Sequence, residues 1–355
     1  MSPPSVSNAS LRPSGTASVT LFRLAFLPGW AVIAATTGAF LAGASLPLTY
    51  QLIPLAASVV LLGLPHGAVD HLALPRTRNE GVTLRWLAAI GVLYAVVGGL
   101  YAAVWFLAPV GAVAAFILMT WVHWGQGEIY PLVALADAAH LGGRLERGLT
   151  AATRGALPML VPFVAFPDQY ELVVTTLVGL FDADAAATAA AAFTPTTRLA
   201  VAAIVGGLVA VTLGIGAVAA SEAGWGPWLL DAGETGLLLL FFATVPPIFA
   251  IGLYFCFWHS LRHIVRLLAV DSRAAPALDG RRYGAALARF ARDAAPLSAA
   301  SLVLLGLLYL AVPGSIDSPL SLVGTYLVLI AVLTLPHVVV VAWMDHEQRL
   351  WRPGA

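Results

Sequence analysis

The feature that most constrains this chain is a series of long apolar segments separated by short polar connections. About ten of them approach the roughly 20 residues that an α-helix needs to cross a bilayer. Only 10% of the residues are charged, whereas soluble globular domains carry roughly 25%. This excludes a soluble enzyme, a disordered protein and a nucleic-acid-binding protein with a basic face. We therefore expect an all-α, polytopic integral membrane helix bundle, with spans near 24–44, 48–72, 84–108, 111–134, 154–167, 197–220, 228–244, 247–269, 295–312 and 319–345.

The domain organisation follows from the same pattern. Residues 1–20 are rich in Ser, Pro and Thr and are predicted to form a disordered N-terminal tail. Residues 21–347 form a single transmembrane bundle, and 348–355 a short C-terminal tail. The acidic and Ala-rich segment 168–195 is expected outside the membrane, as a helix on the surface.

The arginines orient the predicted bundle. All 18 basic residues are arginines, and cytoplasmic loops of membrane proteins carry an excess of positive charge. Placing the N-terminus in the cytoplasm leaves Arg198 as the single arginine outside. The sequence thus predicts ten spans in the cell (inner) membrane, with both termini cytoplasmic.

Besides His71, which stands at the end of the second predicted span, five of the eight histidines fall within predicted spans. They are His66, His123, His259, His263 and His337, in the second, fourth, eighth and tenth segments. In the predicted topology all these helices run from outside to inside, and each histidine lies in the latter half of its helix. Polar residues inside spans are costly and usually face the bundle interior. These histidines should therefore share one depth, in the cytoplasmic leaflet.

The local sequences favour a metal site over isolated interior histidines that are only hydrogen-bonded. His259 and His263, in WHSLRH, share a helix face because they are four residues apart. His66, in GLPHGAVDH, and His123, in TWVHWGQGE, stand beside glycines. Ser260 occupies the position where a zinc protease of the HExxH type needs glutamate. Imidazole suits Fe, Zn, Cu and Ni, so spacing does not select the metal, and haem ligation by two histidines stays open.

These motifs, together with the later LPHVVVVAWMDHE, resemble the Brp/Blh family of membrane-bound β-carotene 15,15′-dioxygenases. The motifs occur in the same order as in the family and extend over residues 63–347. The resemblance implies cleavage of the central double bond of β-carotene by O2 at a non-haem Fe(II) centre, giving two molecules of all-trans-retinal. It implies four metal ligands, which map onto His66, His123, His259 and His263. Beyond the lipid bilayer, it suggests a retinal-binding rhodopsin as an acceptor of the product.

Other polar residues near these motifs are candidates to support the ligands, because metal-bound histidines usually donate their second N–H to a carboxylate or carbonyl. The candidates are Asp70, His71, Glu128 and His337. His140 is expected to be solvated in an arginine-bearing loop. Two other functions stay open at this point: a haem-binding membrane electron carrier, and a non-catalytic carotenoid or opsin assembly partner.

Overall fold

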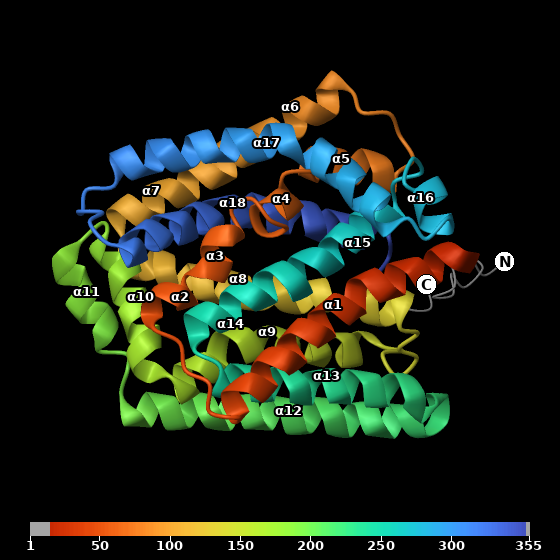
Figure 1. Ribbon diagram of the computed structural model, residues 1–355, viewed down its shortest axis with the longest axis horizontal. Helices are drawn as coiled ribbons and strands as arrows, with labels where there is room; N and C mark the ends of the chain where they lie inside the picture. Colours follow the sequence, from red (N-terminus) through yellow and green to blue (C-terminus); the bar gives the residue numbers. More distant parts are fainter. Residues whose placement is uncertain (1–14, 353–355) are drawn as a thin grey trace.

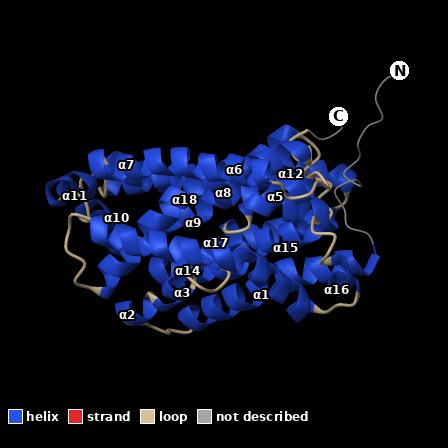
Figure 2. Ribbon diagram, turned by 90° about the horizontal axis from the view of Figure 1, so that it is seen from above, coloured by secondary structure: helices blue, strands red, loops and turns tan. Residues whose placement is uncertain are grey.

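The computed structural model describes residues 15–352, and that part of the chain contains helices and connections but no strand (Figure 2). The helices are α1 (Gly15–Leu41), α2 (Leu48–Gln51), α3 (Ile53–Ala57), α4 (Gly63–Gly67), α5 (Asp70–Thr77), α6 (Leu84–Leu93), η2 (Tyr94–Gly98), α7 (Gly99–Leu107), α8 (Pro109–Tyr130), η3 (Pro131–Leu135), α9 (Arg144–Ala165), α10 (Pro167–Gly179), α11 (Ala183–Ala190), α12 (Pro195–Ala223), α13 (Trp225–Thr244), α14 (Pro247–Tyr254), η4 (Phe255–Ser260), α15 (Leu261–Ala269), α16 (Ala275–Asp279), α17 (Tyr283–Ala311) and α18 (Pro319–Glu347). The η elements are π-helical turns. The all-α membrane bundle is confirmed.

Seven continuous helical stretches in the described part are long and apolar enough to cross a membrane. They are α1, α6 to α7, α9, α12, α14 to α15, α17 and α18. Ten spans were expected and seven stretches qualify, so the predicted number of spans is approximate. The long helices run side by side along the longest axis of the molecule (Figure 1).

The expected span over 48–72 is not a single long helix. The chain there forms four short helices, α2 to α5. Leu62 has a positive φ of 38°, which is an unfavourable conformation for a side chain other than glycine. At Gly63 an added Cβ would lie 2.5 Å from Cβ of Ser58, so only glycine fits this bend. The break turns the chain into the bundle just before His66.

The segment 168–195 is also placed differently from the expectation of a surface helix. It forms α10 and α11, and α10 packs against α8, α9 and α18. Val174, Leu177 and Val178 of α10 are buried. The apolar side of α10 therefore belongs to the bundle.

Helices α8 and α9 form the closest pair in the centre of the bundle, because two glycines let their backbones touch. A Cβ at Gly125 would lie 1.9 Å from the carbonyl oxygen of Ala151, and one at Gly155 would lie 1.9 Å from that of Trp121. Such close approach is typical of small residues between membrane helices. It fixes the position of α8, which carries His123.

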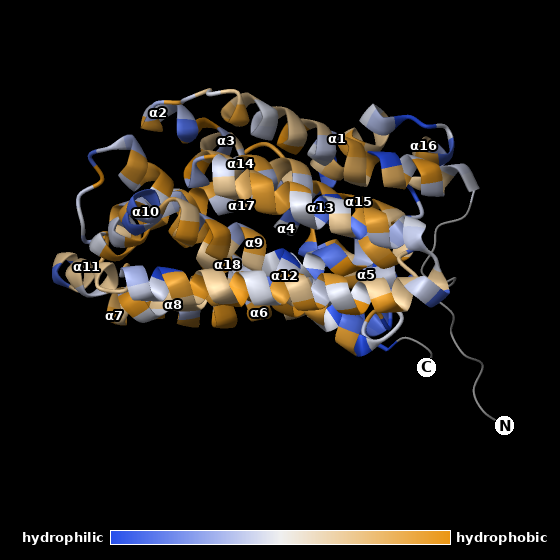
Figure 3. Cartoon of the chain, turned by 90° about the horizontal axis from the view of Figure 1, so that it is seen from below, coloured by the Kyte–Doolittle hydropathy of each residue, from blue (hydrophilic) through white to orange (hydrophobic). Residues whose placement is uncertain are grey.

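The two ends of the described chain lie at the same end of the bundle, beside α16 (Figure 1). Hydrophilic residues gather there around α5 and α16, as Figure 3 shows. Residues 1–14 of the expected N-terminal tail lie outside the described part, but 15–20 belong to α1, where Thr20 donates to the carbonyl of Leu278 at 2.9 Å. In the C-terminal segment Leu350 is fully buried.

Candidate metal centre

Five histidines come together in the interior of the bundle from four separate parts of the chain. His66 lies on α4, His123 on α8, His259 on η4, His263 on α15 and His337 on α18. All five are buried. The ring centroids of neighbouring pairs lie between 4.8 Å, for His123 and His259, and 5.6 Å, for His66 and His263. The expectation that these histidines share one level of the bundle is met.

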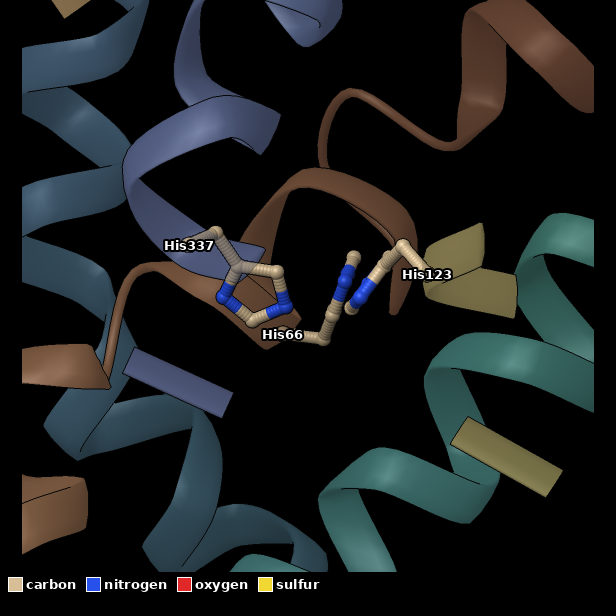
Figure 4. Close-up of side chains that lie close together, drawn as sticks. All are labelled: His66, His123 and His337. Atoms are coloured by element: carbon tan, nitrogen blue, oxygen red, sulfur yellow. The ribbon is translucent and has the colours of Figure 1, made fainter. Parts of the chain in front are cut away.

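Within this cluster, one group of three brings its ligand atoms closest together. One ring nitrogen from each of His66, His123 and His337 lies within 4.8 Å of the others (Figure 4). A second group joins His337 to His263 and a carboxylate oxygen of Asp70. His337 therefore belongs to both groups and lies inside the histidine cluster, although the sequence suggested it only as a residue that supports the ligands.

The backbone break before α4 fixes the orientation of His66. Its Nδ1 atom donates to the carbonyl of Gly63 and lies 3.1 Å from Oγ of Ser260. Because a carbonyl oxygen can only accept, the proton of the neutral ring is on Nδ1, and Nε2 keeps its lone pair for a metal. The second contact explains why a small hydroxyl residue stands at position 260.

The π-helical turn η4 sets the position of His259. Such turns occur often at functional sites, because the extra residue redirects the side chains that follow. The ring of His259 faces His66 and His123, whereas His263, on the regular helix beyond, faces His66 and His337. Gly127 of α8 leaves room for this arrangement, since an added Cβ would lie 3.2 Å from Cε1 of His259.

A chain of hydrogen bonds orients His337. Its Nδ1 atom lies 2.8 Å from Oδ2 of Asp70, and the hydroxyl of Tyr94 donates to the same oxygen at 2.5 Å. A carboxylate paired with one ring nitrogen is the usual support of a metal-bound histidine. Asp70 is buried at the start of α5, and Tyr94 lies in the π-helical turn η2, which packs against α18.

The free nitrogens of the cluster fit a metal ion. Among the described residues, Nε2 of His259, His263 and His337 and both ring nitrogens of His123 are buried without a hydrogen-bond partner. Buried polar atoms are normally paired, so this set of unpaired nitrogens, on rings that lie close together, fits a bound metal ion. Several imidazoles with no thiolate among them suit Fe, Zn, Cu or Ni.

Two apolar cavities meet at the cluster. The first contains His66, His123 and His259 in its wall, and the second His66 and His337. Both include Phe255, Ile330 and Thr334, so they adjoin beside His66. The first cavity has a volume of about 140 Å³ and the second a volume of about 450 Å³. An elongated apolar molecule lying through both would pass directly along the histidines.

The comparisons with known proteins agree with this geometry. The family model for β-carotene 15,15′-dioxygenase matches residues 57–345. The chain belongs to the β-carotene 15,15′-dioxygenase family. It is 47% identical to the probable β-carotene 15,15′-dioxygenase Blh of Halobacterium salinarum, over 93% of this chain and 94% of the relative. It is 31% identical to the probable β-carotene 15,15′-dioxygenase Brp of the same species, over 95% of each chain. No solved structure matches the chain.

Beside the histidines, this member of the dioxygenase family contains a buried network of ion pairs that sequence reasoning missed. Arg262 pairs with Glu128 at 2.7 Å and also with Glu234, and Arg154 pairs with Asp231 at 2.7 Å and with Glu234 at 3.0 Å. All five side chains are buried. The sequence did contain a signal for this network, because Asp231 and Glu234 lie inside the predicted seventh span and charged residues within spans usually pair with a partner in the bundle.

Glu128 connects this network to the metal-centre helix. Its carboxylate accepts from the indole of Trp258 at 3.0 Å and from Arg262. These two residues immediately precede His259 and His263. Glu128 thus holds the helix of two candidate ligands, while among the described contacts it makes no hydrogen bond to a histidine.

The prediction that His140 is solvated is wrong, and the position of His71 gives no support for a role beside the metal. His140 is 1% exposed, and its Nε2 lies 3.0 Å from Oδ2 of Asp231. It therefore belongs to the buried network, because the loop before α9 folds back onto α13. His71 is half-buried in the wall of the second cavity and is absent from both metal-binding groups.

Proposed function

We propose that this protein cleaves the central 15,15′ double bond of β-carotene with O2, producing two molecules of all-trans-retinal at a non-haem Fe(II) centre. The observation that carries the proposal is the cluster of five buried histidines at the junction of two apolar cavities. A carotenoid is apolar, elongated and dissolved in the bilayer, so it suits cavities that lie inside a membrane bundle. Membership of the dioxygenase family supports the reaction.

For the metal ligands we propose His66, His123, His259 and His263, and we add His337. His337 is as well suited to bind the metal as the other four, because its Nδ1 contacts Asp70 and its Nε2 is buried without a partner. Iron, when bound, would activate O2. The donor set alone also suits zinc, copper and nickel, so the identity of the metal requires measurement.

The protein's own residues supply position and environment. Ser260 and the Gly63 carbonyl orient His66, and Asp70 and Tyr94 orient His337. The apolar walls keep water away from the double bond and align the polyene with the cluster. Oxidative cleavage of a carbon–carbon double bond needs no general acid or base, and the proposal assigns none.

We propose that the protein lies in the cell membrane with both termini cytoplasmic. The arginine-rich end, which carries α16 and both ends of the described chain, would then face the cytoplasm. A retinal-binding rhodopsin in the same membrane is the proposed acceptor of the product.

The deciding experiment is expression in a bacterium that makes β-carotene, followed by analysis of the extract for retinal. We expect retinal to accumulate as β-carotene disappears, and the purified protein to contain iron near one atom per chain without a Soret band. A Soret band that tracks the protein would favour a haem-binding electron carrier. Carotenoid binding without consumption of O2 would favour a non-catalytic partner of a retinal protein.

A further inference from the structure

The two cavities at the histidine cluster differ in the exposure of the residues that line them. The residues that line the first cavity are buried or half-buried. The second cavity includes six exposed residues, all on two helices: Leu87 and Gly91 on α6, and Pro296, Leu297, Ala300 and Leu304 on α17. The second cavity therefore has a mouth between α6 and α17 that exposed residues surround.

The packing of α6 and α17 is consistent with such a mouth. Helix α6 packs against α5 and η2, whereas α17 packs against α4, α15, α16 and α18. Gly91 and Ala300 provide little side-chain volume at the rim. On Gly91 an added Cβ would meet no atom within 4 Å. The rim residues Leu87, Leu297 and Leu304 are 41%, 40% and 45% exposed.

The surface around the mouth is apolar and belongs to segments that qualify as membrane spans. Only 17% of the residues in the most apolar window of α6 to α7, and 6% in that of α17, are buried inside the protein. These helices therefore present most of their apolar surface to hydrocarbon in a bilayer. A mouth here opens sideways into the membrane and not into water.

We propose that the carotenoid enters from the bilayer between α6 and α17 and lies through both cavities, with one half in each. The inference rests on the proposed function. The leading half passes His337 and His66 and fills the first cavity, and the trailing half stays in the second. The two cavities adjoin beside His66, and a symmetric substrate cut at its centre needs space on both sides of the metal. The depth of the first cavity then selects the bond that is cut.

The mouth is tested with Ala300→Trp and its matched control Val303→Trp, an exposed position on the same helix outside the cavity wall. A tryptophan side chain at the rim narrows the opening, so we expect about a tenfold slower uptake of β-carotene by the metal-free protein in lipid nanodiscs. The control should take up β-carotene at the wild-type rate. Equal rates for the two variants would overturn the proposal.

A second pair tests the mouth from the opposite helix. Gly91→Leu narrows the rim, while Gly99→Leu adds the same side chain at another exposed glycine of the same span, outside the wall. Both glycines have open space at the Cβ position, so both variants should fold. We expect slow uptake only in Gly91→Leu, with iron content unchanged in both.

The first cavity is tested with Ile117→Trp, which shortens it, and Leu118→Trp, whose side chain faces outward. Two probes are used: β-carotene, and a carotenoid aldehyde with one intact and one shortened half. Ile117→Trp should reduce cleavage of β-carotene about tenfold and spare the shortened substrate. An equal loss of cleavage activity on both substrates would overturn the proposal that each cavity holds one half of the carotenoid. If the wild type binds β-carotene through this mouth but forms no retinal, the proposed function fails and the binding site stands.

Discussion

Nδ1 of His337 lies 2.8 Å from Oδ2 of Asp70, and this pair sets the direction in which the other ring nitrogen points. The Nε2 atom of His337 is buried and unpaired beside His66, His123 and His263. A carboxylate in this position raises the basicity of a ligating imidazole and fixes its tautomer. The pair therefore joins α5 to α18 at the metal centre.

The first prediction concerns Asp70. In Asp70→Ala the ring of His337 loses its anchor, and loss of such a supporting residue lowers metal affinity or activity about 10–100-fold. We expect weaker iron binding by titration of the metal-free protein, with partial recovery of cleavage at high Fe(II). Tyr94→Phe, which keeps the Asp70–His337 contact, should have a smaller effect. Iron affinity unchanged in Asp70→Ala would contradict the role.

The second prediction compares histidines. Alanine at His66, His123, His259 or His263 should abolish retinal formation in a protein that still inserts, and His337→Ala should lower iron content in the same way. X-ray absorption of the iron-loaded protein should count one imidazole fewer in His337→Ala.

The matched control for this series is His71→Ala. His71 is one residue from Asp70 but lies outside the cluster, so its variant should keep wild-type iron and an unchanged imidazole count. If His71→Ala loses iron while His337→Ala keeps it, the assignment of the ligands is wrong.

The third prediction uses Gly127. In Gly127→Ala the new methyl group would lie 3.2 Å from Cε1 of His259, closer than ordinary van der Waals contact. The ring must shift by a few tenths of an ångström, and misplacement of about 1 Å can cost a reaction about 100-fold. We expect a several-fold fall in kcat with little change in thermal stability. Gly148→Ala, where the Cβ meets nothing within 4 Å, should cleave β-carotene at the normal rate.

The fourth prediction concerns the buried ion pairs. Arg262→Met leaves Glu128 and Glu234 without one of their cations, and breaking a buried pair from one side costs about 3–5 kcal/mol. His140→Ala removes a partner of Asp231 and should cost about 1–3 kcal/mol. Thermal unfolding in detergent measures both. The exposed His346→Ala provides the reference, and a His140→Ala variant as stable as this reference would refute the structural role.

The sequence was sufficient to predict the bundle and the meeting of the histidines, because both follow from the positions of the hydrophobic segments and the directions predicted for them. It could not place His337 among the possible ligands, since that depends on how α18 packs against α4 and α5. It also missed the burial of His140, because a loop residue beside arginines is normally solvated. Arg154 and Asp231 lie 77 positions apart, and no local pattern joins them.

The break in the helix at Leu62 is a second feature that the sequence could not predict. The segment 48–72 is apolar enough for a span, and composition alone favours a continuous helix. The positive φ of Leu62 and the crowded Gly63 instead turn the chain, which places the His66 ring against Ser260. Strained backbone of this kind is kept where the surrounding packing enforces it.

The fifth prediction is the topology. The two ends of the described chain lie at the same end of the bundle as α16 (Figure 1), and the arginine distribution assigns this end to the cytoplasm. Reporter fusions after Arg282 should therefore be active in the cytoplasm, and fusions near Asp184 or Asp317 on the outside. Arg198→Ala, which removes the single arginine predicted outside, should leave this orientation unchanged, since it only strengthens the charge bias. An external reporter signal at Arg282 would overturn the orientation, yet it would leave the histidine cluster and the mouth between α6 and α17 unaffected.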